Sequence, residues 1–231
     1  MAKFCTKCGS PLEDGKKCKC ESEKVVVKTN TSSNFTDLLK KYVDLVKESF
    51  KKPVDVVKEN ATEDNFNLSL ISIGITSISM GLFICLIIKN MFGGFSGMVE
   101  IPYVKVFLVG FITIAAMISI LACTTYLLIE KVFKANTSIK KMFVLFGLSS
   151  IILAVAFLVA SVLALVDINI MVPYTVIAIG GILWFAYNIK GIEYYSKLNI
   201  NYVGYVMAIS YAVTSVAIYF LLENVIVKIL M

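Results

Sequence analysis

Hydrophobic residues gather in five long runs over the last two thirds of the chain, and short polar breaks separate the runs. None of the runs contains Asp, Glu, Lys or Arg. The charge-free windows are Leu68–Ile88, Val106–Ile129, Met142–Val166, Ile168–Ile189 and Leu198–Leu222. Each reaches the roughly 20 residues that a helix needs to cross a hydrocarbon core about 30 Å thick. Because lipid offers the backbone no hydrogen-bond partners, each run is expected to be a helix.

These windows predict an all-α polytopic membrane protein whose membrane domain covers residues 68–222. We place the five transmembrane helices at about 68–88, 104–129, 142–166, 170–189 and 202–222. The third and fourth are the hardest to separate, since their apolar runs nearly meet. Asp167, Asn169 and Pro173 interrupt the combined run, and they indicate a tight hairpin at this point.

A shorter apolar pattern precedes the membrane domain, at residues 35–60. Seven apolar residues recur there at helical spacing, and lysines lie mostly off that stripe. Pro53 is expected to end one helix and to open a second. A lysine-rich amphipathic helix beside a span is typical of the membrane interface; a helix packed on the cytoplasmic ends of the spans fits equally well, so both interpretations stay open. The seven residues are Phe35, Leu38, Leu39, Tyr42, Val43, Val46 and Phe50.

The composition argues against several classes of function. Hydrophobic residues make up 58% of the 231 residues, which is beyond the ordinary soluble range. The chain has no histidine, the commonest general base and metal ligand. All 22 basic residues are lysine, and without arginine a nucleic acid is not the expected partner. Since the spans hold no paired carboxylates and no nucleophile with a base, we predict that the chain is not an enzyme.

The lysines predict the topology of the chain. Lys89, Lys105 and Lys228 fall on one side of the predicted spans, and all other lysines precede residue 60 or lie in the predicted loops 130–141 and 190–197. Cytoplasmic segments carry the excess of positive charge, so the N-terminus is expected inside and the C-terminus, after five spans, outside. The polar N-terminal stretch does not have the pattern of a signal peptide. The predicted location is a cell membrane.

Residues 1–21 hold the sharpest motif, a Cys-x2-Cys-x9-Cys-x-Cys pattern made by Cys5, Cys8, Cys18 and Cys20. Two residues between the first pair let both thiolates face one metal ion, and Gly9 permits the positive φ that closes the turn. Four thiolates suit one tetrahedral zinc ion. We therefore predict a small zinc ribbon with one structural zinc. The second pair has a single intervening residue, which predicts a looser site.

Two other interpretations of the cysteines stay open. Iron fits the same cage of four thiolates. A disulfide staple would need an oxidising compartment, whereas the lysine distribution places these cysteines in the cytoplasm. Residues 22–34, which follow the ribbon, are rich in Glu, Lys, Ser, Thr and Asn, and we predict a flexible linker there.

Small, hydroxylated and aromatic residues predict how the spans pack. Alanines at every fourth position, and the pair Gly180-Gly181, should let helices approach closely. Ser and Thr in the spans should bond the carbonyl four residues earlier. Trp184, together with nearby tyrosines, is expected at the inner membrane boundary, and Cys85 and Cys123 should act as small packing residues. The alanines are Ala156, Ala160 and Ala164 in the third span and Ala208 and Ala212 in the fifth.

Two resemblances rest on these residues. The N-terminus resembles the short zinc ribbon that opens many bacterial membrane proteins, in the spacing of Phe4, Cys5, Cys8, Gly9, Leu12 and Gly15. The membrane part resembles the Yip family of five-span proteins with a cytoplasmic N-terminus, in its span count, topology and short third-to-fourth hairpin. The stretches Lys51-Lys52-Pro53 and Asn136–Met142 add to this second resemblance. The eukaryotic members of that family act in vesicle trafficking with small GTPases, so the resemblance implies a role in membrane organisation or a trafficking-like process.

The function expected from the sequence is that of a non-enzymatic membrane scaffold or adaptor whose ribbon recruits a cytoplasmic protein to the lipid bilayer. The alternative is a channel or transporter that metal at the ribbon regulates. Charge-free spans count against the alternative, because pumps and transporters normally keep ionisable groups in the membrane. Hydroxyls and carbonyls can nevertheless line a pore. Whether the chain forms a homo-oligomer stays open.

Overall fold

The computed structural model describes residues 3–4, 11–12, 35–92, 101–166 and 169–226. The chain divides into two compact units, Met1–Leu38 and Leu39–Met231. In the first unit, two short strands pair in antiparallel fashion: β1 (Lys3–Phe4) and β2 (Pro11–Leu12). Lys3 lies opposite Leu12, and Phe4 lies opposite Pro11.

The rest of the described chain is helical. Five helical stretches are long and apolar enough to cross a membrane, which confirms the predicted five-span architecture: Glu63–Phe92, Tyr103–Val132, Ile139–Leu165, Met171–Ser196 and Ile200–Asn224. The elements are α2 (Phe35–Lys51), α3 (Pro53–Asn60), the 3-10 turn η1 (Glu63–Asn65), α4 (Phe66–Phe92), α5 (Tyr103–Leu127), the π-helical turn η3 (Leu128–Val132), α6 (Ile139–Ser149), α7 (Ile151–Leu165), α8 (Met171–Ser196), α9 (Ile200–Leu221) and the π-helical turn η4 (Leu222–Ile226).

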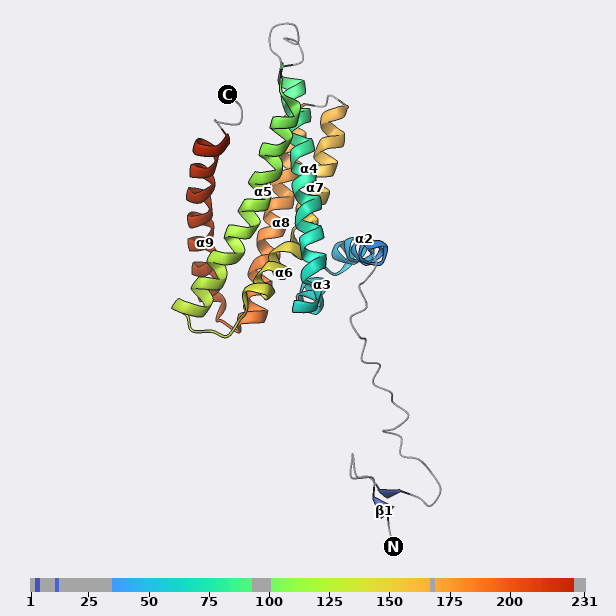
Figure 1. Ribbon diagram of the computed structural model, residues 1–231, viewed down its shortest axis with the longest axis vertical. Coiled ribbons are helices and arrows are strands. Elements are labelled where there is room, and N and C mark those ends of the chain that lie inside the picture. The colour runs from blue at the N-terminus through green and yellow to red at the C-terminus, as the bar shows by residue number, and fades with distance from the viewer. Residues whose placement is uncertain (1–2, 5–10, 13–34, 93–100, 167–168, 227–231) are drawn as a thin grey trace. The chain divides into compact units, whose positions relative to one another are not determined.

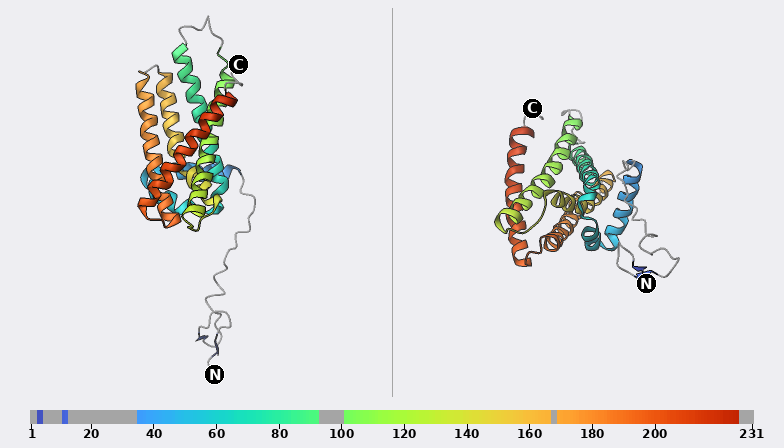
Figure 2. Two further views of the ribbon diagram at one scale, coloured as in Figure 1. Left: turned by 90° about the vertical axis from the view of Figure 1, so that its left-hand side faces the viewer. Right: turned by 60° about the horizontal axis from the view of Figure 1, so that its bottom comes forward.

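The third span lies at the centre of the helix bundle. It is formed by α6 and α7, which meet at Ser150, and 78% of its apolar window is buried, against 22% in each of α8 and α9. The helices α4, α5 and α8 pack around it (Figure 1), and α9 packs mainly along α5. A second view shows α7 and α8 side by side (Figure 2). Because the central span touches protein on most sides, its residues rather than those of α9 fix the packing of the bundle.

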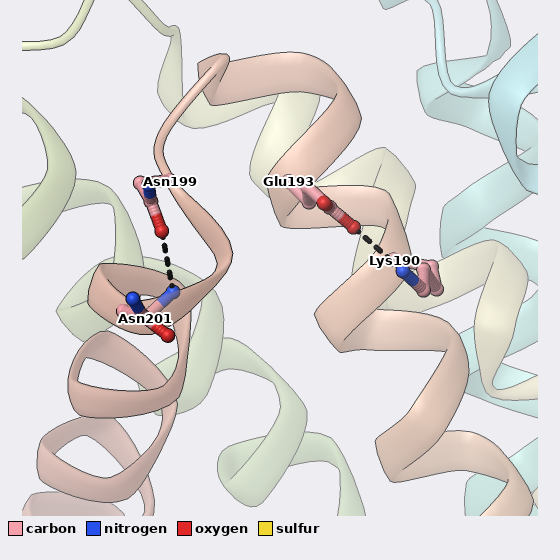
Figure 3. Close-up of polar contacts among 4 residues, drawn as sticks. All are labelled: Lys190, Glu193, Asn199 and Asn201. Carbon is pink, nitrogen blue, oxygen red and sulfur yellow. Dashed lines mark hydrogen bonds and ion pairs between the residues drawn. The ribbon is translucent and has the colours of Figure 1, made fainter.

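The fourth span is longer than the sequence indicated. We predicted a loop at 190–197, but α8 continues to Ser196, so this segment forms its last turns. Lys190 and Glu193 sit one turn apart on the helix surface, with Nζ and Oε2 separated by 2.9 Å (Figure 3), so their charges do not interrupt the helix. Lys197, the C-cap that follows α8, has a left-handed φ of 55°, and Asn199 caps α9 by accepting from the backbone N–H of Asn201.

The predicted hairpin between the third and fourth spans is described in part. The helix α7 ends at Leu165 and α8 begins at Met171. Asp167 lies outside the described residues. Pro173 does not interrupt helix as predicted, since it lies in the first turn of α8, where its missing N–H costs no helical hydrogen bond.

The start of the third span is capped by a serine. Ser138 is the N-cap of α6, and its hydroxyl oxygen accepts from the backbone N–H of Lys141 at 3.2 Å. The same hydroxyl donates to the carboxylate of Glu63 at 2.6 Å. The cap thus also joins α6 to the start of the first span.

Replacing Ser138 with alanine should lower the free energy of unfolding by about 1 kcal/mol, the usual cost of losing an N-cap. Thermal unfolding in detergent micelles measures the change. The matched control is Thr137→Val, because the Thr137 hydroxyl is buried with no hydrogen-bond partner in the described structure and its loss should not destabilise the protein. Equal destabilisation by the two variants would contradict the capping role.

Small residues do allow close helix contacts, although not at every predicted position. Ala156, Ala160 and Ala164 are all buried, as expected. Gly180 faces Ala156 so closely that a Cβ atom at Gly180 would lie 2.5 Å from the alanine Cβ. The prediction for the fifth span was wrong, since Ala208 and Ala212 are exposed. The reason is that α9 turns a different face, which includes Met207 and Ser210, toward the bundle.

Candidate functional site

The predicted metal ligands Cys5, Cys8, Cys18 and Cys20 lie outside the described residues. The structure describes what flanks the first pair: β1 ends at Phe4, directly before Cys5, and β2 begins at Pro11. Phe4 pairs with Pro11 in antiparallel fashion.

The described residues contain no second candidate metal site, because no group of three or more Cys, Asp and Glu side chains among them is placed to hold an ion. Cys85 and Cys123 are free thiols, both partly buried. The Cys85 thiol lies 3.4 Å from the Tyr103 carbonyl of the neighbouring helix α5. These contacts are consistent with the packing role predicted for them.

A hydroxyl cluster joins the first span to the middle of the third. Thr76 on α4 donates to the carbonyl of Ser72, four residues earlier, at 2.8 Å, and lies 3.1 Å from the carbonyl of Ser150. The Ser150 hydroxyl lies 3.0 Å from that of Thr76 and 3.3 Å from that of Ser72. It also bonds the Gly147 carbonyl of its own helix at 2.7 Å. These groups satisfy one another at the point where α6 meets α7.

Most other hydroxyls in the spans bond within their own helix, as predicted. Each of them donates to the carbonyl four residues earlier, at 2.6 to 2.8 Å. A hydroxyl bonded in this way places no unsatisfied donor in lipid. The residues are Ser77, Ser79, Thr113, Ser119, Thr124, Ser161, Thr175 and Ser196.

A second polar cluster lies between α6, α8 and α9, and several of its groups have no partner. The Ser149 hydroxyl donates to the Asn188 amide oxygen at 2.8 Å. Trp184, one turn before Asn188, packs its ring 6.1 Å from that of Tyr211 on α9. Three polar atoms of this group, Trp184 Nε1, Asn188 Nδ2 and Tyr211 OH, are buried with no hydrogen-bond partner among the described residues. This cluster is the candidate functional site inside the membrane domain.

Sequence reasoning misjudged or missed the residues of this cluster. Trp184 was expected at the membrane boundary, but it is 4% exposed and packs edge-on against Phe146. Its distance from the helix end at Ser196 explains the error, since 12 residues of helix span about 18 Å. Asn188 was not singled out, although an amide one turn after a tryptophan in an apolar run was a usable signal.

The cluster can accept or donate hydrogen bonds but cannot exchange protons near neutral pH. It consists of an indole, an amide and hydroxyls, and the buried polar residues among those described include no Asp, Glu or Lys. Leaving three such groups unpaired in an apolar medium costs free energy at each one. The arrangement therefore offers neutral hydrogen-bonding groups and gives no support to acid–base chemistry.

The helices α2 and α3 pack against the spans through buried residues of a shared hydrophobic core. The break between them falls where Pro53 predicted it, with α2 ending at Lys51. Val56 and Val57 of α3 are 4% exposed and belong to the same hydrophobic core as the spans. The Tyr195 hydroxyl near the end of α8 lies 3.0 Å from the Val57 carbonyl and 2.5 Å from that of Lys58.

Replacing Tyr195 with phenylalanine should loosen α3, because the carbonyls in its last turn lose their donor. The expected loss is about 1 kcal/mol, seen as faster hydrogen exchange of the α3 amides in nanodiscs. The control is Tyr194→Phe, since the Tyr194 side chain is 53% exposed and its ring can keep its contact with the Lys58 ammonium. Exchange that is unchanged in the Tyr195 variant would contradict this docking role.

No family model, no curated protein and no solved structure matches this chain.

Proposed function

We propose that this chain is a non-enzymatic membrane scaffold or adaptor, in which a cytoplasmic zinc ribbon recruits a protein partner to the membrane. The observation that carries the proposal is the division of the chain into two compact units. All four cysteines of the metal motif belong to the first unit, and all five apolar helices belong to the second. A tethered binding module next to a membrane anchor raises its local concentration for a partner near the bilayer.

The orientation is part of the same proposal. The lysine distribution supports a cytoplasmic N-terminus and a C-terminus on the opposite side of a cell membrane. The Yip-like architecture is compatible with that arrangement and with a role in membrane organisation or trafficking. One structural zinc held by Cys5, Cys8, Cys18 and Cys20 would give the ribbon a fixed surface, since a segment this small has no core of its own.

The experiment is affinity capture from nanodiscs, which compares the intact chain with a chain that lacks residues 1–21 and with the Cys5→Ser/Cys8→Ser variant. We expect the intact chain to retain a cytoplasmic partner and both altered chains to lose it. The control is Cys85→Ser/Cys123→Ser, which removes two thiols outside the motif. A partner that all four proteins retain equally would exclude the ribbon as the recruiting element.

A second candidate function is a metal-regulated channel or transporter, and the polar cluster of Trp184, Asn188 and Tyr211 favours it. Unpaired hydrogen-bonding groups in the interior of a bundle are a feature of solute sites in membranes. Proteoliposome flux of neutral solutes, measured with and without a zinc chelator and with Asn188→Leu, separates the two candidates. Flux that responds both to zinc and to Asn188, with no partner recovered, would replace the adaptor proposal.

A further inference from the structure

The helix α2 carries two apolar stripes, of which only one is covered by the protein. Tyr42 and Leu45, which are 7% and 4% exposed, belong to the core formed with the spans. Leu39, Val43 and Phe50 are 36%, 50% and 62% exposed. At about 100° per residue these three fall on one line along the helix, next to the buried stripe. The sequence left open whether this helix lies in the membrane interface or packs on the spans. The two interpretations are compatible, because a different face of α2 is available for each.

Charges on α2 are sorted around the helix. Lys40, Lys47 and Lys51 form a row directly beside the exposed apolar stripe, on the side away from the buried one. Asp44 and Glu48 lie one row further round. One exposed ion pair joins the two rows, in which Lys47 Nζ lies 3.6 Å from the Asp44 carboxylate. Both side chains are exposed to solvent, so the pair is weak. The carboxylates therefore do not cancel the positive charge that borders the apolar stripe.

Two contacts determine which way the exposed stripe faces. The Lys41 ammonium bonds the Asn65 amide oxygen at 2.6 Å, at the start of the first span and just before α4 begins. Tyr42, about 100° further round, lies beside Ser72, which is seven residues, or about 10 Å, farther along that span. Burial raises the pKa of the Tyr42 phenol, and the interaction with Ser72 lowers it in part. Lys41, Tyr42 and Val43 follow one another at steps of about 100° around α2. Lys41 faces the end of the span and Tyr42 faces a point farther along it, so Val43, the next in this order, faces toward the bilayer.

The acidic face of α2 lies on the other side, where it meets α3. An open polar recess of about 300 Å³ lies there, lined by Glu48 and Lys51 of α2, Lys52 of the connection, and Asp55, Val56 and Glu59 of α3. A recess lined by charged groups of both signs is a water-facing surface. One side of the α2–α3 corner is therefore hydrated, and the opposite side is apolar with a border of lysines.

We propose that the exposed stripe of α2 is a lipid-binding surface, in which Leu39, Val43 and Phe50 enter the cytoplasmic leaflet and Lys40 and Lys47 contact anionic headgroups. Lysine stems can lie along the apolar region while their ammonium groups reach phosphate. An interfacial helix of this kind binds through its buried apolar area and through attraction to anionic lipid. The proposal concerns α2 alone and does not depend on the ribbon or on a protein partner.

The experiment uses the full chain in nanodiscs and exploits its single tryptophan, Trp184. In a Trp184→Phe background, Val43→Trp places a probe on the proposed lipid face, and Glu48→Trp places one on the water-facing side of the same helix. Brominated phosphatidylcholine should quench the Val43→Trp probe on the order of twofold more than the Glu48→Trp probe. If the background variant does not fold, both probes are measured with Trp184 present and its signal is subtracted.

The role of the lysine row is tested by varying the anionic lipid content of the nanodisc. Adding phosphatidylglycerol to the nanodisc should increase the quenching of the Val43→Trp probe, and Lys40→Gln/Lys47→Gln should abolish that increase. Asp44→Asn/Glu48→Gln, which removes charge from the other face, should not abolish it. A Val43→Trp probe that aqueous iodide quenches and brominated lipid does not would overturn the proposal. Quenching that is independent of phosphatidylglycerol would overturn the headgroup assignment.

Discussion

Replacing Gly180 with leucine is expected to lower the free energy of unfolding of the membrane domain by about 3 kcal/mol, because the new side chain overpacks the contact between α7 and α8. A Cβ atom at this position would lie 2.5 Å from the Cβ of Ala156, and both atoms are fixed by helix backbones. The helices would have to move apart. Since α7 belongs to the central span, that shift would disturb the packing of its other neighbours as well.

The adjacent residue supplies a matched control. A Cβ atom at Gly181 meets nothing within 4 Å, so Gly181→Leu adds the same side chain without a clash. Both variants gain about 1 kcal/mol of helix propensity, so their difference isolates the effect of the close contact. Thermal unfolding of the two proteins in the same detergent measures that difference. Similar stability of the two variants would show that α7 and α8 do not approach closely at Gly180.

The second large effect is expected at the ribbon. Purified protein should contain one zinc ion per chain, and Cys5→Ser/Cys8→Ser should reduce the metal content to zero, because two thiolates do not complete a tetrahedral site. Elemental analysis of the protein in nanodiscs measures the metal and also distinguishes zinc from iron. The control is Cys85→Ser/Cys123→Ser, which should keep the full zinc content.

Loss of zinc should leave the spans unaffected, because the motif and the apolar helices belong to different compact units. We expect thermal unfolding of the membrane domain to change by less than about 1 kcal/mol after chelation, since metal binding is coupled only to the folding of the ribbon. Zinc that survives the Cys5→Ser/Cys8→Ser change would assign the metal to other ligands. Unfolding of the spans on chelation would contradict the separation of the two units.

Local signals in the sequence were enough to predict how many helices cross the membrane and that these elements are helices. Each span is recognisable from its own length and apolarity, which depend on no other segment. The break at Pro53 and the cap at Ser138 follow from backbone chemistry within a few residues. The charged pair Lys190 and Glu193 misled the prediction of the fourth span, because charge at the end of a helix also fits an interfacial turn.

The sequence by itself therefore determined a five-span helical protein with a cysteine motif before it and an amphipathic segment between them. Only the tertiary structure decided which span is central, which glycine touches a neighbour, and that Trp184 faces the interior. Ser149 and Asn188 form a hydrogen bond across 39 residues of sequence. In an apolar helix the residue types on all faces are similar, so the sequence of that helix does not show which face meets which neighbour. Packing among the helices decides this.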